Sequence, residues 1–111
     1  MIATNARIFV ATQWVDFRAS FDRLGGIVRE RLGADPRSGA LYIFFNRGAD
    51  KLKCLFFDQT GDVILYKRLD RHTFRGIIDL DPENARIEID AKRLRDLLIG
   101  LPDPKTGNRI H

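Results

Sequence analysis

The chain has 111 residues, of which 44% are hydrophobic and 31% charged, and this length and composition predict one folded domain rather than a disordered tail. The net charge is +4, with 13 Lys and Arg against 8 Asp and Glu in residues 1–75 and 6 against 7 in the remainder. The basic first part favours a polyanionic partner, with nucleic acid first, and the single cysteine excludes an internal disulfide.

The N-terminal residues carry no export or membrane signal. Residues 1–5 lack the basic flank and the apolar stretch of a signal peptide. No stretch of the chain approaches the roughly 18 apolar residues that a membrane-spanning helix needs. The sequence therefore predicts a cytoplasmic protein with no membrane partner, built as a single domain over residues 1–111 with frayed ends at about 1–5 and 103–111.

A strand and a helix are predicted in the first third of the chain. Arg7 to Val15 is rich in β-branched and aromatic residues, as is typical of a strand, with Ile8, Val10 and Thr12 alternating with Phe9, Ala11 and Gln13. Ser20 stands where a helix N-cap is expected, and Gly33 where the C-terminal cap is expected. Gly25-Gly26 weakens the helix between them, although such a pair can allow close approach of a strand. The apolar positions of this helix fall on one face: Phe21, Leu24, Val28 and Leu32.

Three further strands are predicted in the middle of the chain. The turn residues Asp35 to Gly39 precede three apolar runs, Ala40 to Phe45, Lys51 to Asp58 and Asp62 to Leu69. The short connections between these runs predict a three-stranded antiparallel meander. Because apolar residues fall on both faces of the runs, we expect the sheet to be covered on each side.

The C-terminal third adds one strand and one helix. Ala85, Ile87 and Ile89 alternate with charged residues as in a half-exposed strand, and Asp90 can cap a helix that ends at Gly100 and Pro102. The predicted fold class is α+β, an antiparallel sheet of a central three-stranded meander plus flanking strands, with two main helices. The predicted core comprises Leu41, Ile43, Leu55, Val63, Leu65, Ile87, Leu94, Leu97 and Leu98.

The sequence offers no catalytic residue, cofactor motif or metal site. Cys54 lies in an apolar run as a small buried hydrophobe, and His72 has no histidine or cysteine partner at a metal-site interval. Asp90-Ala91-Lys92 resembles the acid-and-lysine pattern of metal-dependent nucleases, but a helix cap at Asp90 is the stronger interpretation. Carboxylates that could in principle hold Mg²⁺ are Asp16, Asp35, Asp50, Asp58 and Asp70.

Basic residues are interleaved with aromatic ones in the middle of the chain. Phosphate binding by the first group and base stacking by the second is one interpretation, and an aromatic core with a solvated basic rim is the other. The candidate nucleic-acid-binding residues are Arg47, Lys51, Lys53, Lys67, Arg68, Arg71 and Arg75. The accompanying aromatics are Phe44, Phe45, Phe56, Phe57, Tyr66 and Phe74.

An ordered series of segments resembles a known family. The segments are Val15–Arg18, Ser20–Leu24, Asp35–Phe44, Asp50–Lys53, Phe57–Gly61 and Tyr66–Leu69. Together they are similar to the small accessory protein encoded by the second reading frame of IS-sixty-six-type bacterial insertion sequences. This resemblance implies a role in transposition beside a separate large transposase, and it supplies no catalytic residues.

We therefore expect a non-catalytic accessory that binds the DNA of insertion-sequence ends, the transposase or another element-encoded protein, or several of these. A metal-dependent nuclease would instead require carboxylates that converge with a lysine in a cleft. A pure protein adaptor would show an apolar patch and no continuous basic surface.

Overall fold

The computed structural model describes residues 5–74 and 83–99, which form five strands and two helices. These elements are β1 (Ile8–Ala11), α1 (Phe21–Glu30), β2 (Leu41–Phe45), β3 (Lys51–Phe57), β4 (Asp62–Arg68), β5 (Arg86–Ile89) and α2 (Ala91–Ile99). All five strands join one sheet in the order β4-β3-β2-β1-β5.

The sheet confirms the predicted α+β class and its central meander. Strands β2, β3 and β4 pair antiparallel in chain order, and β5 pairs antiparallel with β1. The one parallel pair, β1 with β2, was not predicted. It arises because α1 lies between these strands in the chain, and such a crossover returns the second strand in the direction of the first.

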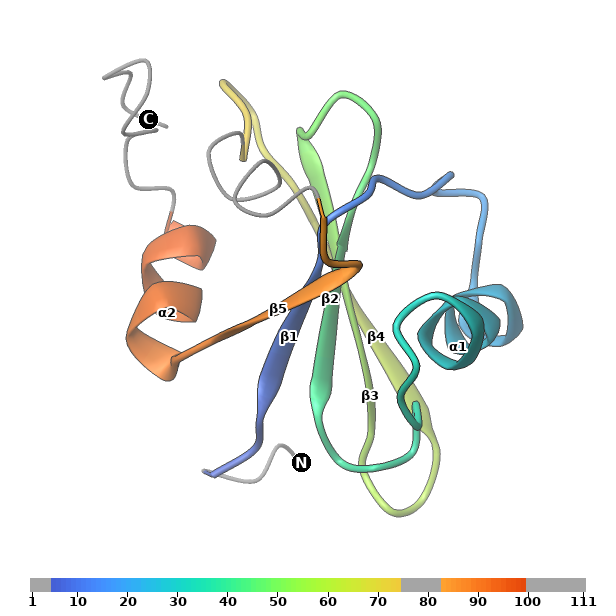
Figure 1. Ribbon diagram of the computed structural model, residues 1–111. Helices are drawn as coiled ribbons and strands as arrows, with labels where there is room; N and C mark the ends of the chain where they lie inside the picture. Colours follow the sequence, from blue (N-terminus) through green and yellow to red (C-terminus); the bar gives the residue numbers. More distant parts are fainter. Residues whose placement is uncertain (1–4, 75–82, 100–111) are drawn as a thin grey trace.

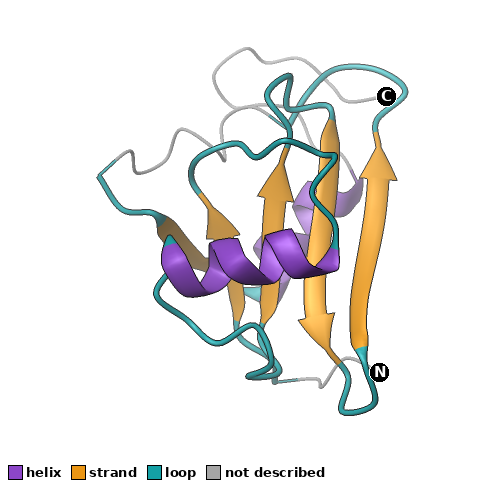
Figure 2. Ribbon diagram, turned by 90° about the vertical axis from the view of Figure 1, so that its right-hand side faces the viewer, coloured by secondary structure: helices purple, strands orange, loops and turns teal. Residues whose placement is uncertain are grey.

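One helix covers each face of the sheet, so the protein has three layers. Figures 1 and 2 show α1 against one face and α2 against the other, and we call these the α1 face and the α2 face. Strand β2 is buried along its whole length, because its alternate side chains enter the two apolar clusters beneath the helices. Within the described ranges, neither helix is long and apolar enough to cross a membrane.

Most of the predicted core is confirmed. Leu41, Ile43, Leu55 and Leu97 are buried. The partly buried residues Val63, Ile87, Leu94 and Leu98 pack against the cluster on the α2 face. The prediction that Leu65 belongs to the core is wrong, because this residue is 51% exposed. It lies on β4, an edge strand that has a neighbouring strand on one side only.

The ends of the first two elements differ from prediction. Strand β1 ends at Ala11, because the chain then leaves the sheet and Thr12 and Val15 bond to other segments. Ser20 occupies the N-cap position of α1, but its side chain makes no capping bond. Phe21, the first residue of α1, is 45% exposed, whereas Leu24 on the same predicted face is fully buried.

The predicted helix terminator and the turn residues are explained by the backbone. Gly33 adopts a φ of +61°, which glycine tolerates, just after α1. A Cβ on Gly25 would lie 3.7 Å from the Arg29 guanidinium and 3.9 Å from the Pro36 side chain, which are ordinary contact distances, so the close approach of a strand that the glycine pair could allow is not seen. Asp35 accepts a bond from the Arg37 amide, and its own carbonyl accepts from the Tyr42 hydroxyl.

Two more of the family-like segments close turns in the same way. The Asn46 and Asp50 side chains are joined at 2.6 Å, and Asn46 also accepts the amides of Asp50 and Lys51. The Asp58 carboxylate accepts bonds from the amides of Thr60 and Gly61. These side chains therefore shape the backbone of the two turns.

Helix α2 begins as predicted. The Arg93 amide donates to the Asp90 carboxylate at 2.7 Å, which satisfies one of the free amides of the first turn. Its predicted end at Gly100 and Pro102 lies outside the described residues.

We expect the Cys54 thiol to be unreactive in the native protein. Cys54 is 6% exposed in β3, and burial raises the pKa of its thiol to about 12, whereas the reactive form is the thiolate. A disulfide reagent at about pH 8 should therefore label the unfolded but not the folded protein. Because the pKa is raised by folding, the free energy of unfolding should fall as pH rises from about 9 toward 12. Rapid labelling of the native protein would contradict this burial.

Candidate functional site

The connection from β1 to α1, residues 12–20, is held to the rest of the protein at several points. The amide of Thr12 donates to the Ala85 carbonyl at 3.0 Å, and the Thr12 hydroxyl donates to the Asn84 carbonyl. The Val15 amide donates to the Phe45 carbonyl at 2.9 Å, and its side chain is buried. The backbone on both sides of Trp14 is therefore fixed, although the Trp14 side chain is 48% exposed.

Lys53, on β3, holds the second half of this connection, at Phe17 and Ala19. It is 7% exposed, and its ammonium donates to the carbonyls of Phe17 and Ala19 at 2.9 and 2.8 Å. The same ammonium lies 5.0 Å from the centre of the Phe17 ring and 5.3 Å from that of Tyr66. Burial lowers the pKa of Lys53. Its charge is thus used inside the protein, and Lys53 is structural rather than part of an exposed phosphate-binding surface.

Replacing Lys53 by methionine should destabilise the fold. The methionine keeps most of the apolar stem but removes both bonds to the connection, at a cost of about 1.5 to 3 kcal/mol in the free energy of unfolding. Lys51→Met on the same strand is the control, because the Lys51 side chain makes no hydrogen bond or ion pair with residues 5–74 or 83–99, and it should cost less than about 0.5 kcal/mol. Chemical denaturation measures both, and equal costs for the two variants would refute the structural role of Lys53.

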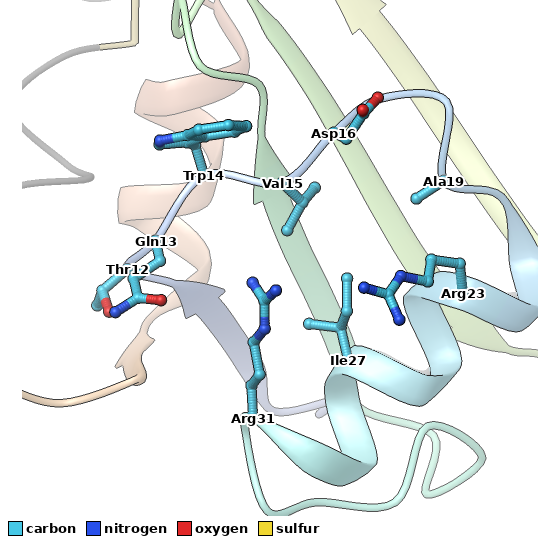
Figure 3. A pocket seen from close by; sticks show the side chains of 9 residues that line it. All are labelled: Thr12, Gln13, Trp14, Val15, Asp16, Ala19, Arg23, Ile27 and Arg31. Atoms are coloured by element: carbon cyan, nitrogen blue, oxygen red, sulfur yellow. The ribbon is translucent and has the colours of Figure 1, made fainter.

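A pocket of about 620 Å³ lies between the connection and α1. Figure 3 shows the guanidinium groups of Arg23, on α1, and Arg31, its C-cap residue, both reaching toward this space on either side of Ile27. Arg23, Ile27 and Arg31 follow one another at intervals of four residues, so they form one stripe along the helix. Trp14 and Gln13 line the opposite wall. We call this space the arginine pocket.

A shallower hollow of about 450 Å³ lies on the other side of Trp14. It is lined by both exposed aromatic side chains of this region, Trp14 and Tyr66, and by Arg47 and Lys51. The Arg47 guanidinium lies 5.7 Å from the centre of the Trp14 ring. Trp14 therefore stands between two basic depressions, and we call the second one the aromatic hollow.

Asp16 does not cancel the charge of the two depressions. Its carboxylate is paired with Arg18, which also lines the aromatic hollow, at 2.7 Å. The hydrogen bonds from Arg18 lower the pKa of Asp16 to about 2, so the carboxylate stays ionised at neutral pH and neutralises Arg18.

The structure brings three of the predicted binding residues together. Arg47 and Lys51 line the aromatic hollow, and Arg68 faces Lys51 across the β3–β4 pair, on the same side of the sheet. Lys67 points to the α2 face, where its ammonium donates to the Leu98 carbonyl. Arg71 is exposed in the loop after β4 and lines neither depression, and Arg75 lies outside the described residues.

Most of the predicted aromatic set belongs to the core. Phe44, Phe45, Phe56 and Phe74 are buried and Phe57 is partly buried, whereas Tyr66 is 54% exposed. Of that set, only Tyr66 has a side chain that is exposed enough to stack on a base.

Three residues of the site were not predicted: Trp14, Arg23 and Arg31. The helical stripe Arg23, Ile27 and Arg31 was visible in the sequence, but its partner surface was not. Trp14 comes to this stripe only because the bonds of Thr12 and Val15 hold the connection there.

A cationic face results from these positions, made of Arg23, Arg31, Arg47, Lys51 and Arg68 around Trp14 and Tyr66. None of these five side chains forms an ion pair with a carboxylate in the part of the chain that the structure describes. Such a face can bind phosphate oxygens through its charges and planar groups through its rings.

The carboxylates do not converge in the same way. Across residues 5–74 and 83–99, no three acidic, histidine or cysteine side chains are grouped as metal ligands. The nuclease-like residues are also occupied elsewhere, because Asp90 caps α2 and Lys92 pairs with Asp96 at 3.0 Å.

Comparison with known proteins gives one family and two relatives. The family described as IS66 Orf2 like protein matches residues 6–106. The uncharacterized protein y4jC of Sinorhizobium fredii is 35% identical over 83 residues, covering 69% of this chain and 71% of its own. The uncharacterized protein y4hO of the same organism is 34% identical over 97 residues, covering 87% and 82%. No solved structure shows significant similarity.

Proposed function

The chain belongs to the IS66 Orf2 like protein family, and from this premise we propose that it acts in transposition as a non-catalytic accessory that binds insertion-sequence DNA. Membership identifies an accessory protein associated with an insertion sequence. The DNA-binding step is our proposal, and it rests on one observation. Five cationic side chains, none of them paired with a carboxylate of residues 5–74 or 83–99, lie on a single face with Trp14 and Tyr66.

The charges of this face suit a phosphate backbone. Arg23 lies on α1 and Arg31 is its C-cap residue, eight positions further on, which separates them by roughly 12 Å along the helix axis. Arg47 and Lys51 continue the positive surface on the other side of Trp14. Successive phosphates of one strand can therefore meet successive cations, and each contact releases condensed counterions.

A protein adaptor is the competing function, since transposase could also meet this face. The exposed apolar side chains are spread over several elements, with Trp14 and Tyr66 beside the cations and Leu65 on the α2 face of β4. A surface that combines exposed rings with cations, which have no carboxylate partner among the residues that the structure describes, favours a nucleic acid over an apolar protein partner.

The experiment is a titration of labelled DNA from the ends of an insertion sequence of this family with the purified protein. Fluorescence anisotropy at about 50 and about 200 mM salt should show binding that weakens steeply at the higher concentration. Binding to the separate transposase, measured in the same buffers, is the comparison. If the protein binds the transposase but no DNA at either salt concentration, the cationic face belongs to a protein interface and the proposal fails.

A further inference from the structure

We propose that Trp14 and Tyr66 stack on the bases of unpaired nucleotides, so that the preferred ligand of the cationic face is single-stranded DNA. This inference rests on the proposed function and specifies its substrate. The rings of Trp14 and Tyr66 carry no charge and are not needed for phosphate binding.

Both rings are exposed to an unusual degree for large apolar side chains. Trp14 is 48% and Tyr66 54% exposed, whereas the predicted aromatics of β2 and β3 are buried or partly buried. The two exposed rings come from segments far apart in the chain, yet they line the same hollow. Phe21 is 45% exposed as well, but it lines neither depression.

The surroundings hold the Tyr66 ring and the backbone on both sides of Trp14 in place. Trp14 lies between the anchored residues Thr12 and Val15. The Tyr66 ring is braced by the edge of Phe17 at a centroid distance of 5.7 Å and an interplanar angle of 79°. A pre-ordered ring loses little conformational entropy when a base stacks on it.

A duplex cannot use such rings well. In double-stranded DNA the base faces are stacked on one another, and only the base edges are exposed in the grooves. An unpaired strand exposes the faces, and proteins that bind it combine aromatic platforms with a positively charged path for the backbone. Here the path runs from Arg23 and Arg31 past Trp14 to Arg47 and Lys51.

Trp14 is the only tryptophan in the chain, so its fluorescence reports directly on the site. Titration with an oligothymidylate of about 12 nucleotides should quench the emission in a saturable manner. A duplex of the same length should bind at least about tenfold more weakly and quench less.

Variants separate stacking from charge. Tyr66→Ala should weaken oligothymidylate binding by roughly 5- to 100-fold, the range typical of losing one stacked base. Tyr66→Phe should retain the affinity. Trp14→Phe should retain most of it as well, as measured by anisotropy of a labelled oligonucleotide, whereas Trp14→Ala should not. The matched control is Phe21→Ala, an equally exposed aromatic outside both depressions, and it should leave the affinity unchanged.

The outcomes distinguish this inference from the proposed function. Binding of DNA without any change in Trp14 emission, or equal affinity for duplex and single strand, would overturn the stacking role and leave DNA binding in place. Loss of affinity in Phe21→Ala equal to that in Tyr66→Ala would also overturn it. Failure of the folded protein to bind either form of DNA would overturn both.

Discussion

Replacing Leu55 by alanine is expected to lower the free energy of unfolding by about 2 to 5 kcal/mol. Leu55 is 2% exposed at the centre of β3, where it pairs with Tyr42 on one side and Ile64 on the other and joins the cluster beneath α1. The truncation removes buried apolar surface and leaves a cavity that the flanking strands cannot fill. A loss of this size is a large part of the stability of a small domain.

Leu65→Ala is the matched control for this prediction. It removes the same atoms from the neighbouring strand, but Leu65 is 51% exposed, so we expect a cost below about 1 kcal/mol. Urea denaturation of the two variants and the wild type measures both values. Equal losses for Leu55→Ala and Leu65→Ala would show that β4 is covered in solution and that the edge of the sheet is misplaced.

The second large effect is expected from removing charge around Trp14. The combined variant Arg23→Ala, Arg31→Ala and Arg47→Ala should lower DNA affinity by roughly 100-fold or more at about 0.1 M salt, if each side chain meets one phosphate. The slope of log affinity against log salt should flatten by about 2 to 3. The reason is that each phosphate contact contributes a slope of about 0.7 for single strands and about 0.9 for duplexes.

A control variant removes three arginines elsewhere: Arg29→Ala, Arg93→Ala and Arg95→Ala. Arg29 lies on α1 like Arg23, and the other two lie on α2, but none lines the arginine pocket or the aromatic hollow. The net charge falls equally in both variants, so a long-range effect of charge would weaken them equally. Only a local site predicts that the control keeps most of its affinity and slope.

The strands and helices could be predicted because their signals are local. Alternation in β5, the Asp90 cap and the meander turns all depend on residues near each other in the chain, and the structure has them where the sequence placed them. The prediction that Leu65 is part of the core was wrong because it depends on distant parts of the chain. Its alternation is that of a core residue, but the position of β4 at the edge of the sheet depends on which strands pair, which no local pattern records.

The candidate site was only half predicted, since it depends on contacts between distant segments. Arg47, Lys51 and Arg68 were identified because they are interleaved with aromatic residues in the sequence, and they do lie on one side of the sheet. Lys53, from the same basic run, turned out to be buried because the connection from β1 to α1 passes over it. That connection also brings Trp14 to α1, and nothing in the sequence near Trp14 indicates it.

Backbone amide chemical shifts of isotope-labelled protein, recorded while the oligothymidylate is added, test the central claim most directly. We predict that the shifted signals gather in residues 13–18, along the Arg23 and Arg31 stripe of α1, and in the segments around Arg47, Lys51 and Tyr66. The indole signal of Trp14 should shift with them, while the signals of α2 stay unchanged. Shifts centred on α2 and Leu65, with the Trp14 signals unmoved, would contradict the assignment of the DNA-binding surface to the cationic face.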